Sequence, residues 1–430
     1  MHWEVFMEPS SAKNKRQTRR FRKPRSLCLS FSSEAVYDRC LADRAYYRRY
    51  LMDQYQHHPE LFPPDWATGF HFHGFVSSKK QGLRQRRIKL KSNGAVYQIR
   101  PSFMMPYMIG RTRTVEKPLF LRRWGVPFEA LAYVFGRDPM YWYRAYLSLG
   151  RPSIVGTTLK NAQHLPEHLI ADEKHTRCRG QKVYIPTTVA HNCILGAEVV
   201  ETPGTEDVKK GYQVFQTEAQ QLKADYAPRT VNTDGWEPTQ TAWKALFPTI
   251  TLLLCFLHAV LAIKNRCRRD RALGYELTTQ LWQVYAAPTL ATFAQRIRRL
   301  REWIQPQPML ASAKEKVLDL CAKAQAFKQA YHHPGCYRTS NGLERLMNYQ
   351  DRLLYAMQYF HGTLQSASLY VRAMALLWNF HPYGRRSQEK YGAQTSPFER
   401  INQFRYHDNW LENMMIAASL RGQITSHKIR

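Results

Sequence analysis

Two stretches of the chain decide the fold: residues 168–176, which read HLIADEKHT, and residues 229–235, which read RTVNTDG. In the first, apolar residues lead into Asp172; in the second, the run stops at Asp234 and is followed by Gly235. Short runs of apolar and β-branched residues bounded by turn-forming residues predict strands. We therefore expect two strands that each carry a carboxylate, with Asp234 at the carboxyl edge of the sheet.

The chain around these stretches continues in strand and helix patterns. Two strands and an amphipathic helix are expected between them, because Val208, Tyr212 and Phe215 share one helix face. A short helix and a fifth, fully buried strand follow. The expected elements, in order, are KVYIPTTVAHNCI (182–194), ILGAEVVET (194–202), EDVKKGYQVFQTEAQQL (206–222), TQTAWKALF (239–247) and TITLLLCFLH (249–258). This order, β-β-β-α-β-α-β, resembles that of an RNase H-like fold, so we expect an α/β protein with a mixed five-stranded sheet flanked by helices.

Composition and pattern divide the rest of the chain into regions. The basic sequence KNKRQTRRFRKPR has little to pack, which predicts disorder. A basic hairpin follows, because Asn93-Gly94 separates two alternating segments. The expected regions are a disordered basic arm (1–27), an N-terminal region with the hairpin (28–112), a helix-turn-helix-like region (113–152), the first part of the sheet domain (160–261), an all-helical insertion (262–337), the last helices of the sheet domain (338–382) and a basic C-terminal tail (383–430) with one more helix near residues 409–419.

Three short helices are expected in residues 113–152. Gly136 makes a turn, Asp138 caps the third helix with Pro139 at its first position, and Gly150 follows its end. This pattern fits a helix-turn-helix, whose third helix can enter a DNA groove. The alternative is a plain three-helix core in which the aromatic residues simply pack. The residues expected to contact DNA are Arg137, Tyr141, Trp142 and Arg144.

The charge of the chain is strongly positive. Lys and Arg number 63 and Asp and Glu 33, which gives a net charge of +30 and an isoelectric point near 9.9. Such an excess attracts polyanions, so nucleic acid is the first expected partner and an anionic membrane surface the second. The stretch QRIRRLREWI carries further candidates for DNA binding, although a solvated helix face explains such residues as well. These candidates are Arg296, Arg298 and Arg299.

One uncharged stretch, residues 245–263, contains 19 residues and just reaches the length of a membrane-spanning helix. Pro248 interrupts it and His258 dilutes it, so we expect a buried strand running into a buried helix, and no membrane span. The chain opens with no signal peptide, and its eight cysteines form no Cys-x-x-Cys pair. A cytoplasmic, nucleoid-associated protein with reduced thiols is therefore expected.

Three acids are candidates for metal-dependent phosphodiester chemistry. Carboxylates at strand ends and on a facing helix can converge on two divalent cations, which prefer oxygen ligands. Asp172 and Asp234 lie on the expected strands, and Glu344 lies in the first turn of a long helix. Each has an ordinary explanation by itself: an ion pair, a turn residue, or a charge favoured by the helix dipole. Their joint presence on this topology, in so basic a chain, favours catalysis.

These motifs resemble those of the DDE transposases, and most closely the Mutator-like group with its bacterial insertion-sequence relatives. That group carries Cys-x-x-His after its second Asp; here Cys255 stands 21 residues after Asp234, and His258 completes the motif. It also carries a helical insertion and an Asn-x-x-Glu motif, which Asn341 and Glu344 match. The resemblance covers about residues 165–385.

The resemblance implies the following roles. Asp172, Asp234 and Glu344 would bind two Mg²⁺ (or Mn²⁺) ions, and Asp172 would bridge them. His258 would position Asp172 or contact the scissile strand. The enzyme would cut at the ends of a mobile element and join the freed 3′-hydroxyl to target DNA, as a homodimer that holds both ends.

Alternatives stay open. An RNase H-fold nuclease without strand transfer would share the three acids, and a catalytically inactive DNA-binding protein would have no reason to keep them. Cys255 and His258 have the spacing of half a zinc site, but no partner pair stands at finger spacing, so zinc is not expected there. The cysteines and histidines of the N-terminal region also lack the regular spacing of a zinc module.

Overall fold

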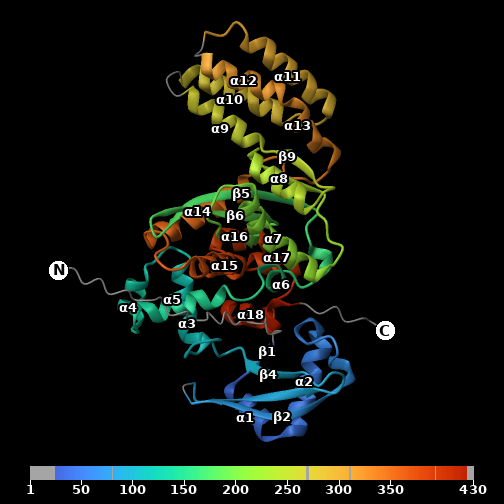
Figure 1. The fold of residues 1–430 in the computed structure, drawn as a ribbon, viewed down its shortest axis with the longest axis vertical. Helices are drawn as coiled ribbons and strands as arrows, with labels where there is room; N and C mark the ends of the chain where they lie inside the picture. Colours follow the sequence, from blue (N-terminus) through green and yellow to red (C-terminus); the bar gives the residue numbers. More distant parts are fainter. Residues whose placement is uncertain (1–24, 80, 268–270, 309–310, 393, 424–430) are drawn as a thin grey trace, which may run out of the picture.

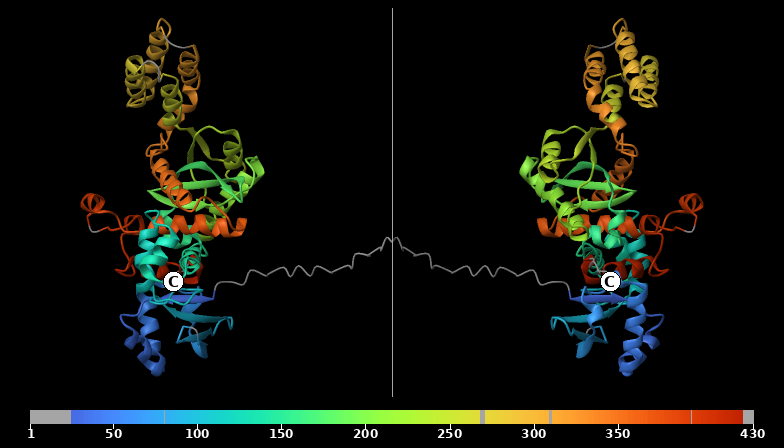
Figure 2. Two further views of the ribbon diagram at one scale, coloured as in Figure 1. Left: turned by 90° about the vertical axis from the view of Figure 1, so that its left-hand side faces the viewer. Right: turned by 90° about the vertical axis from the view of Figure 1, so that its right-hand side faces the viewer.

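The computed structural model describes residues 25–79, 81–267, 271–308, 311–392 and 394–423. The described part of the chain is elongated (Figure 1). A small N-terminal sheet lies at one end, a larger sheet with its helices in the middle, and a group of helices at the other end; the side views show the same order (Figure 2).

The central sheet has five strands in the order β7-β6-β5-β8-β9. Antiparallel pairs join β5, β6 and β7, whereas β8 and β9 run parallel to β5. This confirms the expected α/β class with a mixed five-stranded sheet. The strands are β5 (His168–Cys178), β6 (Gln181–Ala190), β7 (Cys193–Ala197), β8 (Thr230–Thr233) and β9 (Thr251–Leu254).

The fifth strand differs from the expectation in length and burial. β9 ends at Leu254, and a helix begins at Phe256, so His258 lies on that helix and not on the strand. Of the four residues of β9 only Leu253 is buried, because β9 is an edge strand of the sheet. Residues 245–263 therefore span a helix end, a strand and a helix start. None of the helices in the described ranges is both long and apolar enough to cross a bilayer.

Alternation along β5 divides the core into two layers. Leu169 and Ala171 pack with α7 (Thr205–Leu222) and α8 (Glu237–Leu246) on one face of the sheet. Ile170 packs with α14 (Asn341–Ala356) and α15 (Leu364–Phe380) on the other face. Because side chains alternate along a strand, Asp172 belongs to the α14 face and Glu173 to the α7 face.

The N-terminal sheet has the order β1-β4-β3-β2, and two helices cover it. The expected hairpin is confirmed: β3 and β4 are antiparallel, and Gly94 in their turn has a φ of +66°. The expected arm extends too far, because Ser26–Leu29 forms a strand parallel to β4; residues 1–24 lie outside the described residues. The elements are β1 (Ser26–Leu29), α1 (Glu34–Ala42), α2 (Arg44–His57), β2 (Phe70–Ser78), β3 (Leu83–Leu90) and β4 (Val96–Pro101).

Three helices occupy residues 112–149 as expected, followed by a short fourth. Asp138 accepts a hydrogen bond from the Met140 backbone N–H at 2.7 Å, which confirms the predicted cap. The third helix packs along α15 of the sheet domain, so these helices share its core. They are α3 (Thr112–Arg122), α4 (Phe128–Phe135), α5 (Pro139–Leu149) and α6 (Ile154–Thr158).

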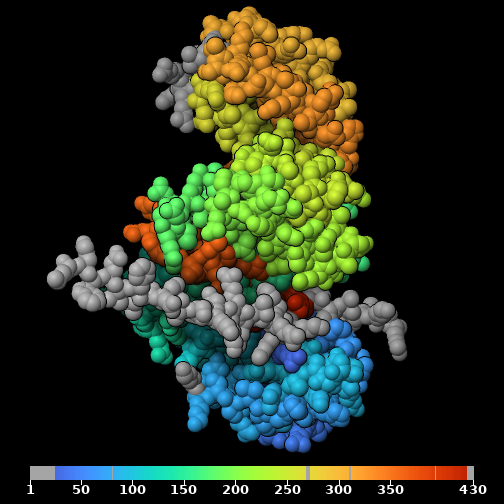
Figure 3. All heavy atoms as spheres, in the orientation of Figure 1, coloured from blue at the N-terminus to red at the C-terminus, as the bar shows by residue number. Residues whose placement is uncertain are grey.

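Helices also fill the chain between β9 and α14. They start at Phe256, earlier than the expected residue 262, and have an apolar core of their own that includes Phe293, Leu300 and Val317. In the space-filling view they form a separate yellow and orange lobe (Figure 3). They are α9 (Phe256–Arg266), α10 (Arg271–Tyr285), α11 (Leu290–Ile304), α12 (Ala311–Ala322) and α13 (Ala324–Lys328).

The helix expected near residues 409–419 is confirmed as α18, but it belongs to the main core and not to a separate tail. Leu411, Met415 and Ile416 are buried in the main core, and the buried Lys160 ammonium donates hydrogen bonds to backbone carbonyls on both sides of this contact, at Gly156 and Ala417. Apolar residues clustered in a short helix outweigh the basic average composition of the segment. The elements are α16 (Arg385–Tyr391), α17 (Pro397–Asn402) and α18 (Trp410–Ala417).

Candidate metal centre

Strand pairing brings the first two acids together. β5 and β8 are parallel neighbours, with Ile170 opposite Asn232. Two residues further along both strands, Asp172 comes level with Asp234, which directly follows the end of β8. Asp234 therefore stands at the carboxyl end of its strand, as expected, whereas Asp172 lies within the longer strand β5.

A tight turn fixes the backbone after β8. The Asp234 carboxylate accepts a hydrogen bond from the Trp236 backbone N–H at 2.8 Å, and α8 begins at Glu237. Gly235 has a φ of +97°, and a Cβ atom there would come within 2.7 Å of the Leu254 side chain. Only glycine combines this conformation with this close approach to β9.

The other two site residues come from the first turns of two helices, α9 for His258 and α14 for Glu344. A buried contact joins these helix starts: the Ser340 backbone N–H donates to Cys255 Sγ at 3.2 Å, and the thiol donates to Ser340 Oγ at 3.2 Å. The Cys255 backbone N–H also donates to the Thr233 carbonyl at 2.8 Å. Cys255 and Ser340 thus hold the ends of β8 and β9 against the start of α14.

Three side chains converge within the described part of the chain. His258 Nε2 lies 3.9 Å from Asp172 Oδ2 and 3.7 Å from Glu344 Oε1, and the ligand atoms of all three lie within 4.8 Å of one another. Asp172 is the least accessible, with 18% of its side chain exposed. Asp234 is exposed and lies outside this closest group. The closest group thus contains two of the three expected acids together with His258, which was also expected at the site.

Burial and neighbouring groups shift the pKa values of Asp172 and His258. Burial first, and then the negative charge of Asp234, raise the pKa of Asp172 to about 6, although the His258 charge lowers it. Interaction with Cys255 raises the pKa of His258 to about 9 in spite of burial, and Asp172 and Asp234 add to the rise. In the absence of a metal, a cationic imidazole is therefore held among carboxylates.

The donor set fits a divalent cation. Burial, and then the nearby charge of Asp234, disfavour the ionised form of Asp172 and so raise its pKa. A cation offsets that repulsion, and carboxylate oxygens are the donors preferred by Mg²⁺ and Mn²⁺. Asp172, His258 and Glu344 could hold a metal ion, and Asp234 supplies further negative charge beside them.

A half-buried acid outside the expected set, Glu173, stands directly beside Asp172. Glu173 points to the other face of the sheet, where its carboxylate accepts hydrogen bonds from Tyr212 at 2.7 Å and Thr239 at 2.5 Å. Burial raises the pKa of Glu173 to about 7, although these two hydrogen bonds lower it. Two adjacent acids on a strand point to opposite faces, and that alternation was the available signal.

Metal binding should strengthen as the pH rises from 5 to 9. A cation must displace the proton of Asp172, whose pKa is about 6, so affinity should fall about tenfold per pH unit well below pH 6. If His258 is a ligand, its proton must also leave, and affinity should keep rising to about pH 9. If only carboxylates bind, affinity should level off above about pH 7. Calorimetric titration with Mn²⁺ across this range measures both effects, and a pH-independent affinity would contradict the assignment.

The expected DNA-contacting residues of α5 divide into exposed and buried ones. Arg137 and Arg144 are exposed. Tyr141 is half-buried, and its hydroxyl donates to the Ile109 carbonyl at 2.7 Å. Trp142 is buried, and its indole N–H donates to the Gly136 carbonyl at 2.9 Å. The expectation that Trp142 contacts DNA is wrong, because its ring completes the packing between α4 and α5.

The expected basic residues of α11 lie on the far helical lobe (Figure 1). Arg298 and Arg299 are exposed, whereas Arg296 is half-buried and donates a hydrogen bond to the Gln283 carbonyl. Ile297 and Leu300 point into the lobe's core, so the amphipathic pattern leaves Arg298 and Arg299 facing solvent. These two residues are thus available to a partner, and the structure assigns them no intramolecular ion pair within the described ranges.

A scan against models of protein families finds none that matches the chain, and a search among curated proteins finds no match either.

Proposed function

We propose that this protein is a DNA transposase that cuts the ends of a mobile element and joins the freed 3′-hydroxyl to target DNA. The observation that carries the proposal is the convergence of Asp172, His258 and Glu344 on a five-stranded mixed sheet, with Asp234 directly after the end of the adjacent strand β8. The order of these residues along the chain resembles that of the DDE transposases, which also supports the proposal.

Each residue has a role in this proposal. Asp172, Asp234 and Glu344 bind two Mg²⁺ (or Mn²⁺) ions, which when bound activate the attacking oxygen and stabilise the leaving one. His258 keeps the Asp172 carboxylate oriented, with its Nε2 at 3.9 Å from Asp172 Oδ2. Water attacks in the first step and the 3′-hydroxyl in the second, so no covalent protein–DNA intermediate forms.

Charge supports DNA as the substrate. The net charge of +30 favours a polyanion, and the exposed Arg137, Arg144, Arg298 and Arg299 supply phosphate contacts at two distant places. A homodimer that holds two DNA ends is part of the proposal, because the joining reaction needs both ends together.

Cleavage and strand transfer on DNA that carries the sequences flanking the coding region test the proposal, with Mg²⁺ or Mn²⁺ present. Nicking at defined ends followed by joining to a second duplex is the expected result. Cleavage without joining would favour a nuclease on the same fold. Binding without cleavage in either metal would favour a catalytically inactive DNA-binding protein.

The double variant Arg298→Ala/Arg299→Ala should weaken DNA binding uniformly across sequences. Loss of two phosphate contacts should reduce the slope of log affinity against log salt by about 2. Anisotropy titrations at several salt concentrations measure this slope. Lys209→Ala/Lys210→Ala on α7 is the matched control, because those lysines already pair with Glu206 and Asp207. If both double variants show the same slope, Arg298 and Arg299 of α11 do not contact DNA.

A further inference from the structure

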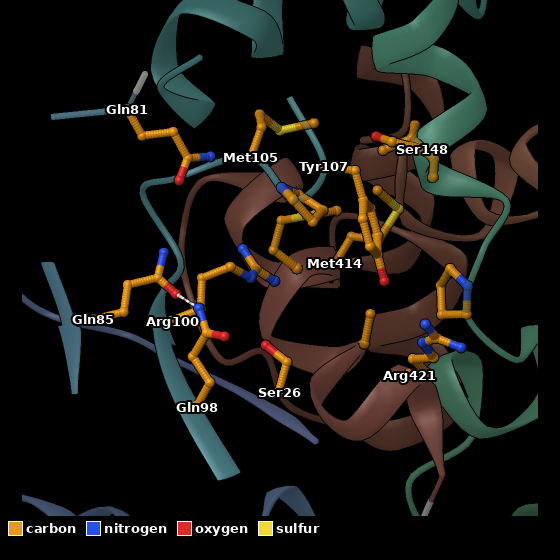
Figure 4. Close-up of a pocket in the computed structure, with 15 residues that line it drawn as sticks. Ser26, Gln81, Gln85, Gln98, Arg100, Met105, Tyr107, Ser148, Met414 and Arg421 are labelled. Atoms are coloured by element: carbon orange, nitrogen blue, oxygen red, sulfur yellow. Dashed lines mark hydrogen bonds between the residues drawn. The ribbon is translucent and has the colours of Figure 1, made fainter. Parts of the chain in front are cut away.

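A cavity of about 270 Å³ lies between the N-terminal sheet and α18, and none of the residues that line it belongs to the elements of the metal centre (Figure 4). Polar side chains from β3 and β4 form one side of it, and methionines from α18 and the loop after β4 form another. Its size is near the lower end of the range for small-molecule sites, about 300 Å³, which suits a single planar ring system. The residues that matter here are Gln85, Gln98, Arg100, Met105, Tyr107 and Met414.

Two amide groups form the polar edge of this cavity. Gln98 Nε2 donates a hydrogen bond to Gln85 Oε1, and Gln85 is only 5% exposed. This pairing leaves the Gln85 amide N–H groups and the Gln98 amide oxygen without a hydrogen-bond partner among the described residues. A donor and an acceptor thus stand side by side at the cavity wall, which is the arrangement that reads the edge of a nucleobase.

Two further polar side chains of the cavity are already bound to the protein backbone. The Arg100 guanidinium donates to the Met104 carbonyl at 2.5 Å, and Gln81 donates to the Met108 carbonyl at 2.8 Å. The Gln85–Gln98 pair therefore supplies the free amide groups of the polar edge.

Tyr107 supplies an aromatic surface at the rim. Its side chain is 58% exposed, and its backbone has a φ of +64°, a conformation that residues with a Cβ seldom adopt. The Arg151 guanidinium lies 4.5 Å from the centre of its ring. An exposed ring with one face against an arginine leaves the other face for stacking, and aromatic–base stacking is tolerant of base identity.

We propose that this cavity takes an unpaired nucleobase, with the Gln85–Gln98 amides at its hydrogen-bonding edge, Tyr107 against its face and the Met105 and Met414 side chains around it. The inference rests on the proposed function in one respect: the base belongs to DNA bound by the basic chain. Arg421, exposed at the cavity rim, is placed to meet the phosphate of the same nucleotide. The cavity holds a base away from the cleavage site, so it serves recognition of the DNA and not the chemistry.

The test measures affinity with the full-length protein in EDTA, so that loss of cleavage cannot affect it. Anisotropy compares a duplex with one bulged base, the same duplex with an abasic bulge, and a perfect duplex. The wild-type protein should prefer the bulged base about tenfold over the abasic bulge. Tyr107→Ala and Gln98→Leu should each lose this preference, whereas Tyr107→Phe should keep it. Tyr133→Ala is the matched control, because Tyr133 is exposed on α4 and does not line the cavity.

A second arm titrates nucleoside monophosphates against the bulged duplex. Competition by a monophosphate, lost in Tyr107→Ala, combined with no preference for the bulge would assign the cavity to a free nucleotide. Equal affinity for all three duplexes and no competition would overturn the inference while leaving DNA binding intact. No binding to any duplex or monophosphate would overturn both this inference and the proposed function.

Discussion

Replacing Asp172 with asparagine is expected to reduce DNA cleavage by about 10³-fold or more, because a carboxylate that holds catalytic metal ions is worth several kcal/mol in the transition state. Asparagine has the same shape and one remaining oxygen, so the backbone pairing of β5 with β6 and β8 should not change. DNA affinity in EDTA should stay within about twofold of wild type, since Asp172 contributes no positive charge.

The same variant should be more stable than wild type when no metal is bound. The folded-state pKa of Asp172, about 6, lies above its ordinary value of 3.8, so the folded protein holds this proton more tightly than the unfolded chain. Stability from this group is present at low pH and is lost as the pH rises from about 4 through 6. At pH 8 in EDTA, Asp172→Asn removes that cost and should raise the free energy of unfolding by about 1–2 kcal/mol.

A loss of cleavage together with a gain in stability would identify Asp172 as a metal ligand, because replacing a structural residue lowers stability. Asp351→Asn is the matched control, because Asp351 lies on α14 and pairs with Lys174 at 2.7 Å on the protein surface. It should leave both cleavage and stability nearly unchanged. An Asp172→Asn protein that cleaves like wild type would refute the site, and one that is less stable would mean that the carboxylate serves packing.

The sequence predicted the elements of the sheet because local patterns determine them. The strands carrying Asp172 and Asp234, the turn at Gly94 and the cap at Asp138 all depend on residues within a few positions of one another. The alternation of side chains along β5 is also a local pattern, and it places Glu173 on the face opposite to Asp172. For such features, neighbouring residues carry the information.

Features that depend on distant contacts could not be predicted. The Cys255–Ser340 contact joins residues far apart in the sequence, and it holds the start of α9, which carries His258, against the start of α14, which carries Glu344. Trp142 is aromatic and lies two residues before Arg144 in α5, yet it packs against Phe135 of α4 and is buried. No local pattern says which side of a helix meets another element of the protein.

The C-terminal segment divides in the same way. The local pattern predicted its helix near residues 409–419, and α18 (Trp410–Ala417) confirms it. The burial of that helix against β1, α3 and α15 depends on residues far away in the sequence. The basic composition of the segment gave no sign of this packing.

Replacing Gly150 with alanine is expected to destabilise the protein by about 3 kcal/mol or more, the upper range for an overpacked core. A Cβ atom at Gly150 would lie 1.9 Å from the Leu369 carbonyl oxygen and 3.0 Å from the Ala373 backbone nitrogen. Both atoms belong to the backbone of α15, so a side-chain rotation cannot relieve the overlap. Arg372 holds the same contact closed by donating hydrogen bonds to the Gly150 and Pro152 carbonyls, at 3.1 and 2.8 Å.

Gly384→Ala is the matched control, because a Cβ atom there meets nothing within 4 Å and its φ of −68° suits any residue. Thermal or denaturant unfolding should show a clear loss of stability for Gly150→Ala and almost none for Gly384→Ala. The result decides whether α3, α4 and α5 pack as part of the sheet domain. A Gly150→Ala protein as stable as wild type would contradict the close approach of α5 to α15. Residues 112–149 would then be an independent unit, as the helix-turn-helix pattern in the sequence predicts, and α5 would be free to enter a DNA groove.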